Sequence, residues 1–399
     1  MSTAIRMQTM QPVLLYGQYE WDRNWLPPDE FEARLADLRR VMSDKGWKWV
    51  VVHGDSQENG LLCYLTNFIP NQRWGLALFG MERPPRLVVP VGSRDLPAVR
   101  KLTWIQDIRA TGDISDAIGS WLREGFDRND VSTGLGKIGF AEVGRMRFDV
   151  AEKALEACRN FSAVEDATSA LTAITHVKRS REIALLRLSY QCLQVLLREV
   201  LRVRSNGGDK KTALLAGERS ARMAGAQDVR MLCSVDKTGA LQPIESHSPA
   251  PLRAGSSEPW PVYLAVRKGG YWAEAMLTIT DAPSAGQRAA RRAIEKAAAS
   301  VCAGITCRDF FCRVEEYRPS SVIHSLLGGG VCRAGGLSLD GEYWMHADSE
   351  EVFVANGVYT IAITSCDGET NQELLSTTIL VRTAGHEILW PTDSEANAY

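Results

Sequence analysis

The chain has 399 residues, of which 45% are hydrophobic and 24% are charged, a composition typical of a globular protein with two or three domains. Its 46 basic and 48 acidic residues give a net charge of −2, so the charge balance predicts neither a nucleic-acid nor an acidic-membrane partner. No apolar run approaches the ~20 residues that span a bilayer. The first residues lack the apolar core of a secretory signal, and the nine cysteines include no CxxC pair. We therefore expect a cytoplasmic protein with reduced thiols.

The first part of the chain alternates between helical and strand patterns. Residues 28–45 carry apolar side chains on one helical face, and Gly46 ends this pattern. Two further helices are expected at residues 115–123 and 148–157. Short apolar runs predict strands at residues 47–52, 75–80, 86–91 and 137–141. This alternation indicates an α/β domain, which we place at residues 1–165.

The second part combines long helices with later strands. A long amphipathic pattern at residues 179–204 ends at Ser205–Gly208, and a second helix is expected at residues 210–224. Strand-like runs follow at residues 230–234, 262–266, 272–280, 357–363 and 375–381. Helices are expected between them at residues 284–302 and 309–317. The pattern predicts an α+β domain over residues 166–399.

Two literal motifs do not carry the function that they suggest. Residues 134–139 match GxGxxG, but they precede a strand pattern, whereas a dinucleotide-binding loop follows a strand and opens a helix. We interpret them as a loop that enters a strand. Cys302, Cys307 and Cys312 recur at a spacing that fits neither one helix face nor a zinc knuckle. The sequence thus predicts no cofactor.

Three segments resemble known family signatures. Phe31–Leu35 and Cys63–Phe68 look like the first helix and the YLTGF-like strand of the creatinase/aminopeptidase P/prolidase superfamily, the peptidase M24 group. Val177–Arg187 is similar to its IKSPEEIALLR signature. The resemblance implies an N-terminal α/β domain, a C-terminal pita-bread domain, and a homodimer in which one N-terminal domain approaches the partner's active site. It also implies that Arg73 contacts the substrate.

The resemblance also locates the metal ligands of the peptidase members, which are two aspartates, a histidine and two glutamates. These positions fall on Tyr263, Glu274, His324, Ala362 and Ser376. One carboxylate and one imidazole remain, which are too few to hold two mutually repelling cations. We therefore expect no metal and no metallopeptidase activity.

Creatinase is a metal-free member of this superfamily, so the loss of ligands does not by itself imply loss of activity. His247-Ser248-Pro249 is similar to its base-bearing element, which implies that His247 is a catalytic base. Cys332–Leu337 resembles its GREAGL element, which implies that Arg333 binds a substrate carboxylate. The two creatinase glutamates that hold the guanidinium of creatine fall on Met276 and Ala362, so creatine is not the expected substrate.

These implications predict a metal-independent, creatinase-like enzyme that cleaves a C–N bond in a small, carboxylate-bearing metabolite. His247 would be the base, His324 and Tyr263 would polarise the scissile group, and Glu274 would tune a histidine. Each of these side chains has a plain structural alternative, as a hydrogen-bonded core or loop residue. Two other functions stay open: a non-hydrolytic enzyme of a specialised pathway (cyclisation, elimination or decarboxylation), and a non-catalytic binding protein. The binding protein could use an N-terminal tryptophan patch of Trp21, Trp25, Trp47, Trp49 and Trp74.

Overall fold

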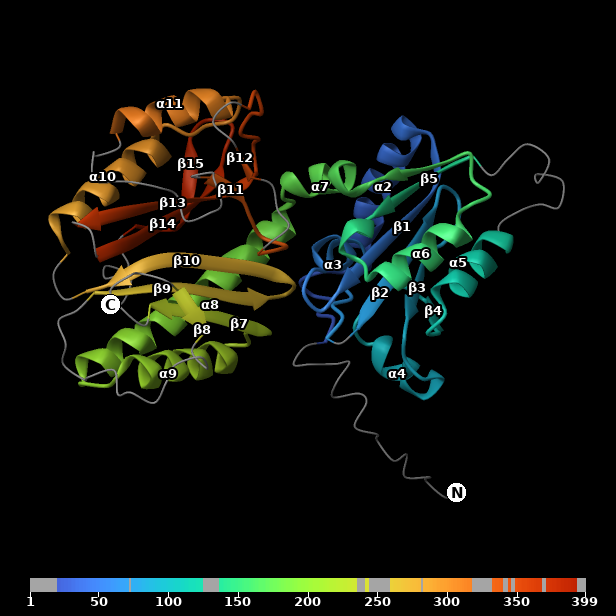
Figure 1. Cartoon of the computed structure of the whole chain (residues 1–399), viewed down its shortest axis with the longest axis horizontal. Helices are drawn as coiled ribbons and strands as arrows, with labels where there is room; N and C mark the ends of the chain where they lie inside the picture. Colours follow the sequence, from blue (N-terminus) through green and yellow to red (C-terminus); the bar gives the residue numbers. More distant parts are fainter. Residues whose placement is uncertain are drawn as a thin grey trace, which may run out of the picture. The chain divides into compact units, whose positions relative to one another are not determined.

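The computed structural model (Figure 1) describes residues 20–71, 73–124, 136–234, 241–243, 259–280, 283–317, 332–339, 344–345, 349–367 and 371–392. The chain divides into two compact units between Thr175 and His176, at the end of helix α7 (Thr168–His176). The sequence suggested a boundary between residues 165 and 166, before this helix. No helix among the described residues is long and apolar enough to cross a membrane.

The first unit is an α/β domain, as predicted. Its six-stranded sheet has the order β4-β3-β2-β1-β5-β6. The strands are β1 (Trp47–Asp55), β2 (Trp74–Gly80), β3 (Arg86–Val89), β4 (Asp107–Ala110), β5 (Lys137–Ala141) and β6 (Ala163–Asp166). The helices are α2 (Pro28–Lys45), α3 (Gly60–Thr66), α4 (Leu96–Val99), α5 (Ile114–Arg123) and α6 (Phe148–Ala157). Strand β1 is parallel to β5 and antiparallel to β2, and is buried on both faces.

One predicted element of this unit was wrong. Cys63–Phe68 was expected to form a strand, but its first four residues belong to helix α3, which is buried along its whole length. The helix ends where Asn67 adopts a left-handed conformation (φ 61°) and donates its backbone N–H to the Cys63 carbonyl. A short, fully apolar run has no periodicity that separates a buried helix from a buried strand.

The second unit is an α+β domain, as predicted, built on a nine-stranded sheet. Its main order is β12-β11-β13-β14-β10-β9-β7-β8, and β15 pairs with β14. The strands are β7 (Asp228–Ser234), β8 (Leu241–Pro243), β9 (Trp260–Lys268), β10 (Tyr271–Ile279), β11 (Cys332–Ala334), β12 (Trp344–Met345), β13 (Val358–Asp367), β14 (Asn371–Val381) and β15 (His386–Trp390). The helices are α8 (Ser180–Ser205), α9 (Lys210–Met223), α10 (Ala285–Ala299) and α11 (Cys307–Tyr317).

Helices cover one face of this second sheet. Helices α10 and α11 form an apolar core with alternate residues of β13 and β14, among them Ile361 and Leu375. Helix α8 is joined to β10, because the Tyr271 hydroxyl donates to the Glu182 carboxylate at 2.9 Å. Because successive side chains of a strand point to opposite faces, the alternating set on β9, β10, β13 and β14 faces away from the core formed by α10 and α11. That face carries the polar residues Tyr263, Glu274, Thr360 and Thr378 among apolar ones, and it contains the candidate site.

Candidate active site

Three of the residues predicted from the sequence meet on this polar face of the second sheet. Tyr263 on β9 donates its hydroxyl to Glu274 Oε2 at 2.9 Å. Arg333 on β11 forms an ion pair with Glu274 Oε1 through its Nη2, and its Nη1 donates to the Leu339 carbonyl. Glu274 and Arg333 are each only 3% exposed. The centre of the site is therefore a buried carboxylate held between a guanidinium and a phenol.

The strand register explains how these side chains meet. In the β9–β10 hairpin, Met276 lies opposite Tyr263 and Glu274 lies opposite Ala265, so Tyr263 and Glu274 are diagonal neighbours on one face. Arg333 comes from a strand that is distant in the sheet order. The backbone N–H of Trp272 donates to the Gly336 carbonyl at 2.6 Å, which brings the segment after β11 against the start of β10.

A chain of hydroxyl groups lies beside the carboxylate. Tyr190 of helix α8 donates to Thr378 Oγ1 at 2.9 Å, and the hydroxyls of Thr378 and Thr360 are 3.1 Å apart. Burial raises the pKa of Tyr190 above its usual value, and the charge of Glu274 raises it further. Burial and the same charge also raise the pKa of Tyr263. Both phenols therefore stay protonated at physiological pH and act as hydrogen-bond donors.

Two positions that the resemblance aligned with metal ligands, Ser376 and Ala362, have a structural role here. Among the described residues, β10 and β14 share a single register pair, Leu277 with Leu375. Where the two strands separate, the Met276 amide donates to the Ser376 hydroxyl at 2.8 Å. Ala362 joins a small apolar cluster with Met276 and Leu374. Ser376 thus accepts a hydrogen bond from a backbone amide at the point where the two strands separate, and Ala362 packs in the apolar cluster.

The residues that the structure describes at this site do not fit a two-metal centre. Both oxygens of Glu274 are engaged, one by a guanidinium and one by a phenol. The guanidinium is a fixed positive charge, so a metal cation at this carboxylate would be repelled. Among the described residues, no three His, Cys, Asp or Glu side chains are grouped so that they could hold a metal ion.

The other predicted site residues are not tested by this geometry. Arg73 belongs to the first unit, where its Nη1 donates to the Pro90 carbonyl at 2.9 Å and its backbone is left-handed (φ 60°). Its contact with a substrate stays a prediction. His247 and His324 lie outside the described residues. Sequence reasoning missed Tyr190, Thr360 and Thr378, for which the sequence offered no signal beyond hydroxyl side chains on two strands and on an amphipathic helix.

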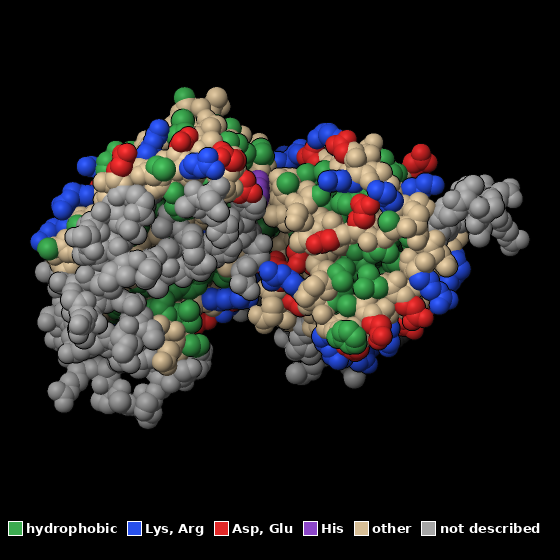
Figure 2. Space-filling model, turned by 45° about the horizontal axis from the view of Figure 1, so that its top comes forward, with side chains coloured by type: hydrophobic (Ala, Val, Ile, Leu, Met, Phe, Trp, Pro, Cys, Tyr) green, Lys and Arg blue, Asp and Glu red, His purple; other side chains and the backbone are tan. Residues whose placement is uncertain are grey.

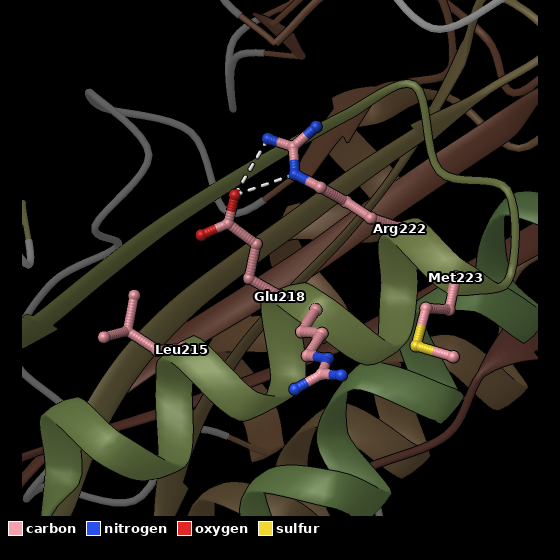
Figure 3. Close-up of a pocket in the computed structure, with 5 residues that line it drawn as sticks. Leu215, Glu218, Arg222 and Met223 are labelled. Atoms are coloured by element: carbon pink, nitrogen blue, oxygen red, sulfur yellow. Dashed lines mark hydrogen bonds and ion pairs between the residues drawn. The ribbon is translucent and has the colours of Figure 1, made fainter.

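A separate hollow of about 500 Å³ lies on helix α9 (Figure 3). Leu215 and Met223 line it and are 47% and 79% exposed, and Arg222 pairs with Glu218 at 2.8 Å. Its lining includes none of the predicted site residues. Figure 2 shows positive and negative side chains interspersed over the visible described surface of both units, in keeping with the small net charge.

The sequence matches no protein-family model and no curated protein sequence. The structure, in contrast, is similar to solved structures of prolidases and related proteins. It matches the prolidase of Pyrococcus horikoshii OT3 with a TM-score of 0.73 and 15% identity, over 91% of this chain and 99% of that one. It matches an Xaa-Pro dipeptidase from Bacillus anthracis with a TM-score of 0.69 and 16% identity, over 90% and 97% of the two chains.

A further match has a different description. The N-terminal domain of the FACT complex subunit SPT16 from chickpea (Cicer arietinum) aligns with a TM-score of 0.69 and 12% identity, over 93% of this chain and 97% of that one. The protein therefore has the two-domain, pita-bread fold of the creatinase/aminopeptidase P/prolidase superfamily. At these identities the likeness establishes the fold, while activity has to be argued from the site.

Proposed function

We propose that the protein is a metal-independent, creatinase-like enzyme that cleaves a C–N bond in a small, carboxylate-bearing metabolite. The observation that supports this proposal is the buried Glu274–Arg333 pair with its Tyr263 donor. It stands where the peptidases of this fold carry metal-binding carboxylates. Removing two charges from water costs several kcal/mol per ion, and well-packed apolar side chains are often as stable. A buried ion pair on the face that carries the site is therefore a candidate for function.

The proposed reaction is hydrolysis. His247 takes a proton from water, the water oxygen bonds to the substrate carbon, the C–N bond breaks, and the leaving nitrogen receives the proton from the imidazolium. His324 donates a hydrogen bond to the oxygen or nitrogen on which negative charge develops, and Tyr263 does the same once its hydroxyl turns from Glu274 to the substrate. Glu274 orients a histidine, and Arg333 holds Glu274 in place. We further propose a cytoplasmic homodimer in which Arg73 contributes to substrate binding.

The test is a turnover screen in the presence of EDTA. N-acyl, N-carbamoyl and guanidino derivatives of small amino acids are incubated with the protein, and the released amine is measured by mass spectrometry. We expect one class to be cleaved without added metal, and His247→Ala and Glu274→Gln to reduce its turnover by at least about 100-fold. Turnover that EDTA abolishes and manganese restores would overturn the proposal. Product without oxygen from labelled water would instead indicate cyclisation, elimination or decarboxylation.

A second candidate is a non-catalytic binding protein. It is supported by the likeness to the FACT complex subunit, whose name places it in a complex. The tryptophan patch that this function could use is only partly exposed, because Trp25 is 40% exposed whereas Trp47 and Trp49 are buried. This candidate predicts no product from any compound of the screen, and an unchanged melting temperature with all of them.

A further inference from the structure

A cationic and aromatic group lies at the hairpin end of the same sheet face. The guanidinium carbons of Arg230 and Arg267 each lie 5.0 Å from the ring centroid of Trp272. The three residues come from the adjacent strands β7, β9 and β10. Such contacts stabilise a cation over an aromatic ring by about 0.5–1 kcal/mol at partly exposed sites. We call this group the arginine–tryptophan shelf.

The strand register places the shelf beside the buried carboxylate. Arg267 lies opposite Trp272, and Ala265 lies opposite Glu274. Arg230 in turn lies opposite Ala265. Trp272 and Glu274 are thus two residues apart on one face, about 7 Å along the strand. Across the strands, only the methyl group of Ala265 separates Arg230 from Glu274.

The charges of the site leave a role for these arginines. The substrate carboxylate was assigned to Arg333, but that guanidinium is engaged by Glu274 and by the Leu339 carbonyl. At the shelf, two guanidinium groups contact one indole ring, and Asp228, which lies opposite Arg267 in the strand register, is the carboxylate that pairs with Arg230. Asp228 approaches Arg230 at a long 3.4 Å, and the Arg230 side chain is 38% exposed. A second carboxylate from a ligand can therefore reach it.

The backbone holds the shelf in place. The Gln227 amide donates to the Arg267 carbonyl at 2.7 Å, and the Gly270 amide donates to Gln227 Oε1 at 2.9 Å. Gly269 and Gly270 have positive φ angles of 59° and 85°, which the tight turn between the strands requires. Trp272 is joined to Gly336, as described above. Binding an anion here would cost little ordering of the hairpin.

We propose that Arg230 and Arg267, stacked on Trp272, bind the carboxylate of the substrate and direct the rest of it toward Glu274. This proposal rests on the proposed function for the identity of the substrate, but not for the binding of the anion. Arginine suits this role because its planar fork matches the two oxygens of a carboxylate. The shelf thereby takes over the task that the resemblance assigned to Arg333.

The test compares two probes that differ only in charge, N-acetylglycine and N-acetylglycinamide, by isothermal titration calorimetry at constant ionic strength. We expect N-acetylglycine to bind at least about tenfold more tightly than the amide. Arg230→Met and Arg267→Met should each weaken its binding by about tenfold or more. Arg219→Met, an exposed arginine of α9, is the matched control and should leave binding unchanged. Melting curves confirm that each variant is folded.

Three results would overturn the shelf. They are equal binding of acid and amide, full binding by both shelf variants, and no heat of binding with N-acetylglycine at any reachable concentration. If Arg333→Met abolishes binding and both shelf variants keep it, the substrate carboxylate binds to Arg333 and not to the shelf. That result would be compatible with the proposed metal-independent reaction and would reject only the anion site at the shelf. If binding depends on Arg230 but no compound is turned over, the anion site is supported and the proposed hydrolysis is rejected.

Discussion

The two units each bury a carboxylate, and they neutralise it in different ways. Glu274 in the second unit is held by Arg333 and receives a hydrogen bond from Tyr263. Glu142 in the first unit follows β5, and its side chain is 13% exposed. It shares Arg145 with Glu58, at 3.1 and 3.7 Å. Burial raises the pKa of Glu142 to about 7, the charge of Glu58 adds to the rise, and Arg145 opposes it.

This difference shows two solutions to the cost of a buried charge. In the second unit, the protein supplies the compensating cation from its own sequence. In the first unit, Arg145 is shared by two carboxylates, and Glu142 takes up a proton from solvent as the pH falls through about 7. Substitution should therefore act strongly on Glu274 and its partners, whereas pH should act on Glu142.

Arg333→Met removes the cation from the second unit. We expect the free energy of unfolding to fall by about 3–5 kcal/mol, because Glu274 is left buried without its ion-pair partner. Urea unfolding followed by circular dichroism measures the loss. Arg202→Met, which breaks a surface pair with Glu199, is the control and should cost less than about 1 kcal/mol. An equal cost for the two variants would contradict the account of the site.

Tyr263→Phe removes the hydrogen bond to Glu274 and keeps the ring. We expect a loss of about 2 kcal/mol, since hydrogen bonds to charged groups exceed those between neutral groups. The same unfolding experiment measures it. A stability equal to that of the wild type would show that the hydroxyl does not hold the carboxylate.

Thr378→Val removes the acceptor of Tyr190 and the partner of Thr360, with little change in shape. We expect a loss of about 1 kcal/mol, which is smaller because these groups are neutral and because the Glu274 backbone also hydrogen-bonds Tyr190. Thermal unfolding of this variant is compared with that of Thr383→Val, an exposed threonine after β14, which controls for a general effect of the substitution. If the exposed variant loses more stability than Thr378→Val, the hydrogen bonds of the hydroxyl chain do not stabilise the fold.

Glu142→Gln tests the first unit. The pKa of Glu142 is about 7 in the folded state and 4.5 in the reference state, so folding takes up a proton between these values. Its contribution to stability is therefore fully present below pH 4.5 and is lost as the pH rises toward 7. The difference in stability between wild type and variant should change across this window and be constant outside it. Comparing the two proteins cancels the opposite effect of His53, whose pKa burial lowers to about 4. A difference that does not change with pH would contradict the prediction.

Much of the fold could be predicted because long elements carry their own periodicity. Helix α8 and strand β10 lie within a residue or two of their expected bounds. Some short elements were missed, because the four-residue strands β4 and β6 have too few positions to show a pattern. Helix α3 was misassigned for the same reason. Its stability comes from burial of all its residues, which the local sequence does not reveal.

The candidate site was predictable in part. Tyr263 and Glu274 are eleven residues apart on the two strands of one hairpin, so their contact follows from the local sequence once the turn at Gly269 and Gly270 is placed. The approach of Arg333 depends on the packing of the segment after β11 against the start of β10, which no local sequence pattern encodes. The shelf likewise depends on the register between β7 and β9.

A double-mutant cycle on Glu274 and Arg333 measures whether an internal ion pair occupies the centre of this site. The free energy of unfolding is measured for the wild type, Glu274→Met, Arg333→Met and the double variant. The account predicts that the double variant is at least as stable as either single variant, with a coupling energy of about 3 kcal/mol. Additive losses, with the double variant the least stable of the four, would contradict it.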